Sequence, residues 1–401
     1  MVIRQAGWAR PPFHRTIETV VCGGLCLVDS SMRTPGEGKR TGLSPQPSGV
    51  RRVGLTGVHG FIGNRVLLDG HALLHHEVEF VGADLLGSEG RATAQRTAGL
   101  SRYRFMPHLA FLEALESGAL LPDLVIHNGA CSTTTETDPR VFRDLNVMYS
   151  TRLWAACARQ RIPLIFASSA SVYGNGEQGF DDDPVKTAAY SALNLYGRSK
   201  LDFDRHALAA QEYPPCWCGL RYFNVYGFDE SHKGAQASMV LHGTRQALAT
   251  GVIRLFQGDD RSGGRCADGE QKRDFVSVED VSAVTWRLAG FMCGQAGQDW
   301  KRRLEKVAEP EGPVSLRSGT FLNVGTGRAR TWNDLARAVF LALGRSPSIE
   351  YIAMPMALRA HYQNFTEAKH TMADRLGLAM PWLSLEQGAG RYVAQLVASS
   401  A

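Results

Sequence analysis

A glycine-rich turn between an apolar strand and a helix is the feature that most constrains this chain of 401 residues. The motif Thr56-Gly57-x-x-Gly60-x-x-Gly63 follows an apolar strand, 53–56, and precedes a helical pattern that runs to about residue 75. Glycines let the backbone turn tightly and approach a phosphate closely, and the helix N-terminus offers free N–H groups. Asp84 ends a second strand, 77–84, where a carboxylate can reach a ribose hydroxyl. These features together predict a dinucleotide-binding unit; three turn glycines and an unrelated surface aspartate are the alternative.

Strands alternate with helical patterns up to about Gly227, which is typical of a parallel sheet with helices on both faces. The expected strands are 53–56, 77–84, 124–128, 164–168 and 218–222. The fold class is therefore predicted as α/β, a Rossmann-type doubly wound parallel sheet with a smaller C-terminal substrate-binding domain.

The expected domain boundaries lie where the alternation of strands and helices begins and ends. They are 1–50, a disordered or non-native extension; 51–225, the Rossmann domain, with returning segments near 274–290 and 366–378; and 226–401, mainly the substrate-binding domain. Two polar, Gly-rich stretches, 259–272 and 294–319, are expected to be surface loops or insertions.

The net charge of +5 is confined to residues 1–52, which hold eight basic and three acidic residues. The basic character belongs to this stretch, so it does not indicate nucleic-acid binding. Residues 1–50 lack a periodic pattern and are expected to be a disordered tail or the result of a start codon assigned too early; a targeting sequence is a third interpretation.

The chain has no run of about 18 apolar residues, so we expect no transmembrane helix and no membrane partner. The eight cysteines form no paired CxxC array, which argues against a metal site. Free thiols in a cytoplasmic protein are the expectation.

Two further motifs suggest acid/base chemistry. Tyr196 and Lys200, four residues apart, lie on one face of a helix, where an ammonium group can lower the pKa of a tyrosine and make it a usable acid/base. An exposed helical pair is the alternative. Ser169 stands at the end of an expected strand, where its hydroxyl can hold a substrate oxygen beside Tyr196. A serine-rich turn that satisfies its own backbone is the alternative for Ser169.

The glycine motif, the strand-end serine and the Tyr-x-x-x-Lys pair resemble the extended short-chain dehydrogenase/reductases, the NAD-dependent epimerase/dehydratase family. Other segments are similar to the ADP-L-glycero-D-manno-heptose 6-epimerases of that family. They are His127-Asn128-Gly129-Ala130-Cys131-Ser132-Thr133-Thr134 with Asn146, Arg221-Tyr222-Phe223-Asn224-Val225-Tyr226-Gly227, His232-Lys233-Gly234, Leu255-Phe256-Gln257-Gly258, Arg273-Asp274-Phe275-Val276, Asn323-Val324-Gly325-Thr326-Gly327 and Tyr362-Gln363-Asn364-Phe365-Thr366. The resemblance covers about residues 52–396.

This resemblance implies a specific reaction in lipopolysaccharide core biosynthesis. Such an enzyme oxidises the C6 hydroxyl of a nucleotide-activated heptose with bound NADP, and hydride then returns to the other face of the 6-keto intermediate. Inversion needs an acid/base on each side, and the resemblance implies Tyr196 and Lys233 for these roles, with Lys200 and Ser169 completing the catalytic set. A cation that only binds the diphosphate is the alternative for Lys233.

The resemblance also implies the residues that hold the two ligands. Cofactor contacts carry over to Thr56, Gly57, Gly60, Phe61, Ile62, Gly63, Asp84, Arg91, Asn128, Gly129, Ala130, Cys131, Ser132, Asn146, Tyr196, Lys200 and Val225. Substrate contacts carry over to Asn224, Val225, Lys233, His242, Phe256, Gln257, Gly258, Asp259, Arg273 and Tyr362. Arg273 suits a diphosphate because a guanidinium bonds two oxygens at once, and a buried structural role is the alternative for His242.

The expected cofactor is NADP, with NAD possible. Asp84 alone favours NAD because a carboxylate repels a 2′-phosphate, whereas Arg91 stands where the family has a lysine suited to that phosphate. Three departures from the family bear on its ligands: Leu85 replaces an asparagine beside the ribose, Ala235 replaces a serine of the substrate site, and the stretch 259–272 is inserted.

The expected partner is a small nucleotide-sugar substrate, and the resemblance implies a homo-oligomer. The rival interpretations are another extended-family enzyme, such as a UDP-sugar 4-epimerase or a reductase, and an inactive NAD(P)-binding regulator. The His232-Lys233-Gly234 segment favours the heptose epimerase over the 4-epimerase. Retention of Ser169, Tyr196 and Lys200 argues against the inactive regulator.

Overall fold

The alternating pattern folds into one parallel sheet of seven strands. In chain order these are β1 (Arg52–Thr56), β2 (Glu79–Asp84), β3 (Tyr103–Pro107), β4 (Leu124–His127), β5 (Leu164–Ser169), β6 (Trp217–Tyr222) and β11 (Gly319–Val324). Their spatial order is β11-β6-β5-β4-β1-β2-β3, and each neighbouring pair is parallel. The predicted Rossmann-type sheet is confirmed. Because strand order reverses at β1, a crevice for a ligand is expected between the carboxyl ends of β1 and β4.

The computed structural model describes residues 49–74, 77–85, 97, 99–134, 136–258, 266–293, 296–307, 312–356, 362–378 and 380–400. Arg91 and Asp259, both expected to contact ligands, lie outside these residues. Within the same ranges, no helix has both the length and the apolar character needed to cross a membrane.

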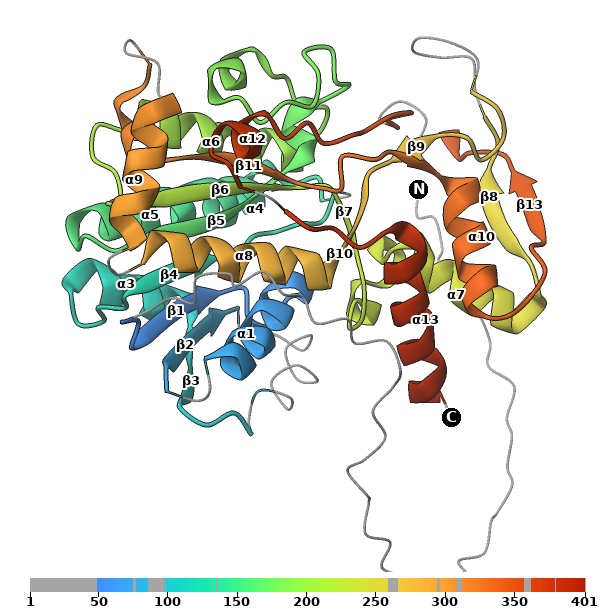
Figure 1. Ribbon diagram of the computed structural model, residues 1–401, viewed down its shortest axis with the longest axis horizontal. Helices are drawn as coiled ribbons and strands as arrows, with labels where there is room; N and C mark the ends of the chain where they lie inside the picture. The colour runs from blue at the N-terminus through green and yellow to red at the C-terminus, as the bar shows by residue number, and fades with distance from the viewer. Residues whose placement is uncertain are drawn as a thin grey trace, which may run out of the picture. The chain divides into compact units, whose positions relative to one another are not determined.

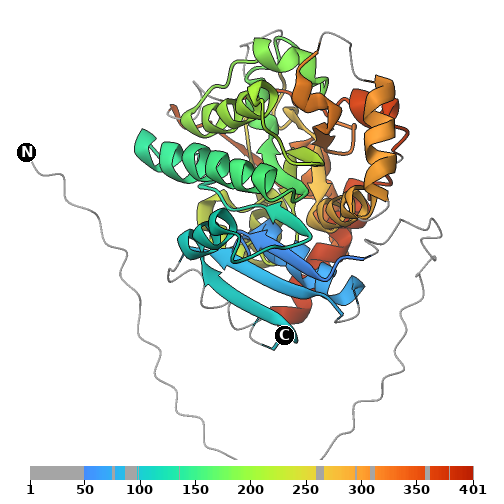
Figure 2. The same cartoon turned by 90° about the vertical axis from the view of Figure 1, so that its left-hand side faces the viewer.

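Helices cover both faces of the sheet (Figure 1). One face carries α1 (Phe61–Leu73), α8 (Val278–Met292) and α9 (Ala296–Val307), and the other carries α3 (His108–Ser117), α5 (Tyr149–Arg159) and α6 (Leu195–Ala209). The short α4 (Pro139–Phe142) and a π-helical turn (Arg143–Met148) lead into α5, while α12 (Thr371–Arg375) contacts β11. In Figure 2 the green helices and the orange helices lie on opposite sides of the sheet.

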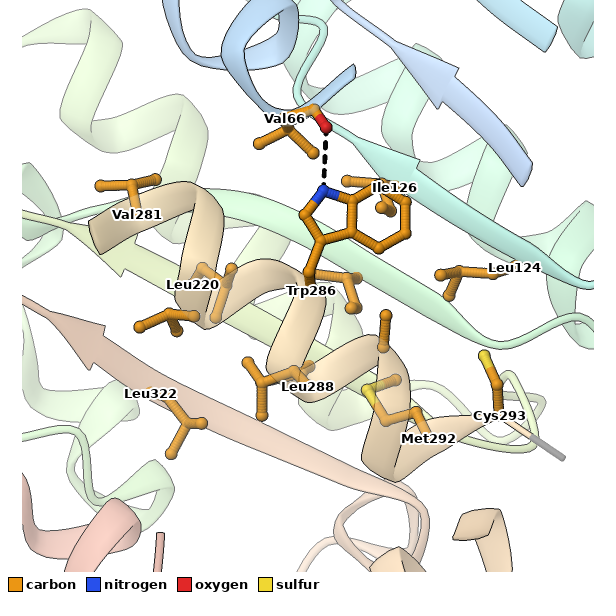
Figure 3. Packing of buried hydrophobic residues seen from close by; sticks show 14 of the residues in the cluster. Val66, Leu124, Ile126, Leu220, Val281, Trp286, Leu288, Met292, Cys293 and Leu322 are labelled. Carbon is orange, nitrogen blue, oxygen red and sulfur yellow. Dashed lines mark hydrogen bonds between the residues drawn. The ribbon is translucent and has the colours of Figure 1, made fainter. Parts of the chain in front are cut away.

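Trp286 on α8 lies in the apolar core between α1, α8 and the sheet (Figure 3). Its indole Nε1 donates a 2.8 Å hydrogen bond to the carbonyl oxygen of Val66, which precedes it by 220 residues. Gly70 makes room for the indole, because a Cβ at this position would lie 1.9 Å from Cζ2 of Trp286. Helix α8 of the C-terminal half is therefore part of the layer that supports the glycine turn.

The remaining elements gather beside the sheet around a third apolar core. Three small strand pairs are β7 (Asn224–Tyr226) with β10 (Phe275–Ser277), β8 (Ile253–Phe256) with β13 (Ile349–Ile352), and β9 (Lys272–Arg273) with β12 (Arg330–Thr331). The helices α7 (Met239–Thr250), α10 (Trp332–Ala342) and α13 (Leu385–Ser400) pack against one another and against these strands. Short 3-10 turns occupy Ala170–Tyr173, Pro184–Ala189, Ser231–Gln236 and Val314–Arg317.

The expectation of a surface loop is wrong for 294–319 and holds in the described part of 259–272 up to β9, although one side chain there is buried. The stretch 294–319 contains α9, whose Trp300 and Leu304 are buried against the sheet, and ends at the first residue of β11. In the stretch 259–272, Gln271 is fully buried and donates to the carbonyl of Gln257 at 2.9 Å. Among the described residues of both stretches, only a few side chains face the core.

Candidate active site

The glycine turn is shaped by close contacts that leave no space for a side chain. Gly57 has φ +75°, and a Cβ there would lie 2.7 Å from the backbone of Asn128 and Gly129. A Cβ on Gly63 would lie 2.0 Å from the carbonyl oxygen of Gly57. These contacts bring the start of α1 against the ends of β1 and β4, which is the cradle that a dinucleotide phosphate requires.

A buried hydrogen-bond chain supports this cradle from below. The Thr56 hydroxyl accepts from the backbone N–H of Gly129 at 3.0 Å and lies 2.6 Å from Nδ1 of His127. Nε2 of the same histidine lies 2.9 Å from the Ser150 hydroxyl. Burial lowers the pKa of His127 to about 3, so the imidazole is neutral and can accept from Thr56 at one nitrogen and donate to Ser150 at the other. Thr56 was predicted from sequence; Ser150 was not.

Asp84 lies where β2 ends, beside the glycine turn. Its carboxylate accepts the backbone N–H of His59 at 2.8 Å and that of Leu85 at 2.7 Å. A small open pocket lies here, and the departure Leu85 forms part of its wall. It is lined by Thr56, Gly57, Ala83, Asp84, Leu85, His108, Gly129, Ala130, Leu145 and Tyr149. The pocket fits the adenosine end of a dinucleotide, since it joins the glycine turn to a carboxylate at the end of β2.

The segment after β4 is held in place by Asn146. The Asn146 side chain accepts from the N–H of Cys131 at 2.8 Å and donates to its carbonyl and to the Ser199 hydroxyl, each at 2.9 Å. Asn146 is buried, so it positions this wall of the crevice against α6. Asn128 accepts from the Tyr222 hydroxyl at 3.1 Å, and its buried Nδ2 has no hydrogen-bond partner among the described residues. A buried, unpaired amide donor fits a site built for a polar ligand.

Ser169 and Tyr196 meet at the carboxyl edge of the sheet. Asn194 caps α6, its side chain accepting the N–H of Gly197 at 2.8 Å, and this helix presents Tyr196 to the end of β5. Burial raises the pKa of Tyr196, and a hydrogen bond from the Ser169 hydroxyl opposes that shift. In the chain alone, burial outweighs the groups that lower the pKa of Tyr196, so its net pKa lies above the usual value.

Lys200 lies one turn further along α6 and is buried. Its ammonium donates to the carbonyl of Ala167 at 3.0 Å. Burial lowers the pKa of Lys200 to about 8, and the carboxylate of Asp204 on the next turn opposes the shift. Asp204 is in turn paired with the fully buried Arg221 of β6 at 3.0 Å. A buried set of charges therefore lies directly beneath the predicted acid/base.

Lys233 reaches the glycine turn from the other side of the crevice. It lies in the 3-10 turn Ser231–Gln236, and its Nζ sits 4.8 Å from the centre of the Phe61 ring, at the first residue of α1. Its Nζ also donates to the Glu230 carboxylate at 3.2 Å. Glu230 was not predicted from sequence, although its spacing of three residues from Lys233 is one that a helical turn brings together.

A second cluster forms around Arg273. Its guanidinium lies 4.9 Å from the centre of the Tyr362 ring and donates to the carbonyls of Lys272 and Gln363. Trp332, which was not predicted, donates from Nε1 to the Tyr362 hydroxyl at 2.8 Å. The guanidinium is thus fixed by protein carbonyls and aromatic faces, as a rigid anion ligand would be.

Other predicted substrate contacts lie on elements around this cluster. The Phe256 and Tyr362 rings are 6.2 Å apart, edge to face. Gly258 allows a close approach, because its Cβ would lie 1.7 Å from the carbonyl oxygen of Cys266. Asn224 is exposed at the start of β7. His242 lies on α7, and its buried Nε2 has no hydrogen-bond partner in the part of the chain that the structure describes.

Comparison with known proteins agrees with this geometry. Residues 53–300 match the model of the NAD dependent epimerase/dehydratase family. The chain is 35% identical over 351 residues to an ADP-L-glycero-D-manno-heptose-6-epimerase of Nitratidesulfovibrio vulgaris, covering 86% of this chain and 98% of that one. It is 39% identical over 284 residues to the enzyme of the same name from Fusobacterium nucleatum. That match covers 69% of this chain and 77% of the relative.

Solved structures show the same fold. The Helicobacter pylori ADP-L-glycero-D-manno-heptose-6-epimerase superposes with a TM-score of 0.64 at 25% identity, covering 87% of this chain and 97% of that one. A UDP-glucose 4-epimerase of Thermotoga maritima superposes with a TM-score of 0.62 at 22% identity, covering 87% of this chain and 100% of that one. This second comparison supports the fold but not the activity. With its glycine turn, its Ser169–Tyr196 contact and these relatives, the chain belongs to the NAD dependent epimerase/dehydratase family.

Proposed function

We propose that this protein is an ADP-glyceromanno-heptose 6-epimerase that interconverts ADP-D-glycero- and ADP-L-glycero-β-D-manno-heptose through a 6-keto intermediate. The observation that carries the proposal is the crevice itself. Tyr196 and Ser169 meet on the sheet side, while Lys233 approaches the glycine turn from the C-terminal side. Relatives that align with 86% of the chain carry this activity in their names.

Each residue of the sheet side has a part in moving one proton. Tyr196 takes the proton of the C6 hydroxyl from the epimer that faces it, and gives a proton back to that oxygen only in the reverse reaction. The Ser169 hydroxyl donates to the tyrosine oxygen and so favours the phenolate. Lys200 supplies a buried positive charge next to the reacting centre. A bound nicotinamide cofactor supplies the hydride acceptor for this oxidation and the hydride for the return step.

Inversion at C6 requires a second acid/base, because the returned hydride adds to the opposite face. Lys233 is the residue we assign to that face. We assign binding of the diphosphate, the alternative role of Lys233, to Arg273. The Arg273 guanidinium is fixed by backbone carbonyls and an aromatic ring. Residues 226–401 then form mainly the substrate-binding domain, with Asn224, His242, Phe256, Gln257, Gly258, Asp259 and Tyr362 around the nucleotide sugar.

The proposed cofactor is NADP. Asp84 binds the adenosine ribose, and Arg91 provides the positive charge for the 2′-phosphate. This phosphate distinguishes NADP from NAD. The proposed cofactor site comprises the glycine turn with Phe61 and Ile62, the wall from Asn128 to Ser132, and Val225. We further propose that the enzyme is a cytoplasmic homo-oligomer of the lipopolysaccharide core pathway.

The test uses purified protein with ADP-D-glycero-D-manno-heptose and no added cofactor, and anion-exchange chromatography to separate the two C6 epimers. Conversion to the L-glycero epimer supports the substrate, the reaction and a retained cofactor together. Folded protein that contains nicotinamide cofactor but leaves the D-glycero epimer unchanged contradicts the heptose assignment. UDP-glucose and UDP-galactose in parallel reactions test the 4-epimerase alternative.

A further inference from the structure

The backbone around Lys233 is set by a short, well-defined turn. The N–H of Lys233 donates to the Glu230 carbonyl at 3.0 Å, and Gly234 has φ +56° with ψ −125°, which favours glycine. Nothing lies within 4 Å of a Cβ at Gly234, so the conformation alone accounts for the glycine. This turn fixes where the Lys233 side chain begins but not where its four-carbon chain ends.

Glu230 fixes the other end of that side chain. Its carboxylate is fully buried, and the N–H of Ser238 donates to Oε2 at 2.7 Å, the oxygen that also accepts from Lys233 at 3.2 Å. The Ser238 hydroxyl donates to Oε1 at 2.5 Å, and Tyr392 of α13 adds a further side-chain hydrogen bond. Donors from α7 and α13 therefore hold the carboxylate rigidly.

A buried carboxylate with this many donors is an anchored charge, unlike a surface glutamate. The Lys233 side chain is 27% exposed to solvent. Without Glu230 as its partner, this long side chain would therefore sample many rotamers. On the far side, the Phe61 ring offers its face at 4.8 Å. The ammonium thus lies between an anchored anion of the C-terminal part and the first residue of α1.

We propose that Glu230 is a positioning residue for the reaction, holding the Lys233 amine at the edge of the crevice where the second proton transfer takes place. This inference rests on the proposed epimerase function. The step balances as follows for the epimer that faces Tyr196. Tyr196 takes the C6 hydroxyl proton as hydride leaves, and the Lys233 ammonium gives one proton to the C6 oxygen as the same hydride returns to the other face. Tyr196 then releases its proton to solvent and Lys233 takes one up. Glu230 touches neither substrate nor cofactor and acts only through Lys233.

Steady-state kinetics of Glu230→Gln against the wild type provide the first test. Glutamine keeps the size of the side chain and one oxygen for Ser238, but its NH₂ group has no charge to hold Lys233. We expect kcat to fall at least about tenfold and KM for the ADP-heptose to change less than about threefold, since a transition-state interaction is lost. Glu230→Asp, which keeps the charge on a shorter side chain, should recover part of kcat.

Ser238→Ala provides the matched control. It removes a hydrogen bond to the same carboxylate and the side-chain cap of α7, at a cost of about 1 kcal/mol, but leaves the charge beside Lys233. We expect a lower melting temperature and a loss of kcat clearly smaller than that of Glu230→Gln, because the charge and the donors from the Ser238 N–H and Tyr392 remain. If the loss of kcat follows the fall in melting temperature in the same way for Ser238→Ala and Glu230→Gln, Glu230 has only a structural role.

A spectroscopic readout separates positioning from general damage. Each epimer is mixed in turn with excess enzyme, and reduction of the bound nicotinamide is followed by its near-ultraviolet absorbance. In Glu230→Gln the epimer whose hydroxyl faces Tyr196 should still reduce the cofactor at the wild-type rate, whereas the other epimer should do so slowly. Equal slowing of both epimers overturns the inference and leaves the epimerase function intact. If the wild type reduces its cofactor with neither epimer, the proposed function and this inference fail together.

Discussion

Burial acts on both members of the Tyr-x-x-x-Lys pair and disfavours the charged form of each. It raises the pKa of Tyr196 and lowers the pKa of Lys200 to about 8. The proposed mechanism needs charge on both residues, so each depends on neighbours that oppose the effect of burial. The Ser169 hydroxyl favours the charged form of the tyrosine, and the Asp204 carboxylate favours the charged form of the lysine. The Ser169 contact could be predicted from the motif, whereas the opposing effect of burial needed the surroundings of the phenol.

Removing the Tyr196 hydroxyl tests the proton-transfer role directly. Tyr196→Phe keeps the ring and its packing but has no proton to exchange, so we expect epimerisation to slow about 10²–10⁴-fold. The melting temperature should stay close to that of the wild type. Tyr213→Phe, beyond the C-terminal end of α6, is the control and should retain activity. A Tyr196→Phe enzyme with more than half of the wild-type rate would show that another group moves the proton.

The lowered pKa of Lys200 makes stability depend on pH in a definite direction. Below about pH 8 the ammonium is charged in both the folded and the unfolded chain, so its burial penalty is constant. Between about pH 8 and 10.4 the unfolded chain binds a proton that the folded chain lacks, so folding becomes more favourable as pH rises. Relative to Lys200→Met, the wild-type free energy of unfolding should rise by on the order of 2–3 kcal/mol between pH 7 and 10.

Urea unfolding of both proteins across this pH range provides the measurement. Lys306→Met, at an exposed position of α9, is the control for replacing a lysine by methionine and should unfold close to the wild type at pH 7. Parallel stability curves for the wild type and Lys200→Met would contradict the predicted proton release.

At the scale of elements, α1 and α8 approach closely because Gly70 has no side chain. Gly70→Ala would place a methyl group 1.9 Å from the Trp286 ring, so the indole must shift and its hydrogen bond to Val66 must weaken. We expect a loss of about 1–3 kcal/mol in the free energy of unfolding. Gly390→Ala on α13, where nothing lies within 4 Å of the new Cβ, should instead stabilise by about 0.5–1 kcal/mol. Thermal unfolding that ranks the two variants the other way would contradict this account.

Five of the seven strands of the sheet could be predicted from sequence, whereas β3, the fully buried β11 and helix α9 were missed. The strands β1, β2, β4, β5 and β6 were expected because their residues are nearly all buried. The edge strand β3 was missed because it is partly exposed, contains Arg104 and ends at Pro107. Helix α9 was missed because only a few of its side chains, among them Trp300 and Leu304, enter the core. Glu230 was missed because a charged residue in a loop gives no sign of burial.

Across the molecule, Asp274, which lies between β9 and β10, joins two segments that are far from it in the sequence. Its fully buried carboxylate accepts from the N–H and the hydroxyl of Thr326 at 2.6 and 2.7 Å, and from the N–H groups of Gly327 and Ala368 at 2.8 and 3.0 Å. The loop after β11 and the strand-like segment before α12 are therefore held by one side chain.

Asp274→Asn removes one acceptor and turns its NH₂ group toward backbone donors. We expect a loss of about 2–4 kcal/mol in the free energy of unfolding, because at least one buried N–H is left unpaired. Asp299→Asn, on the exposed face of α9, should change it by less than about 0.5 kcal/mol. Denaturant unfolding that finds the two variants equally stable would contradict the role of Asp274 as a junction.

The hydrogen bond from Trp286 to Val66 has a consequence for biosynthesis. The helix that begins at the glycine turn keeps one apolar side uncovered until a partner 220 residues further along the chain has left the ribosome. Contacts of such long sequence separation form late, because a large loop must first close. The nascent cofactor-binding half therefore emerges with an unfinished hydrophobic surface, and the completed phosphate cradle is a property of the nearly full-length polypeptide.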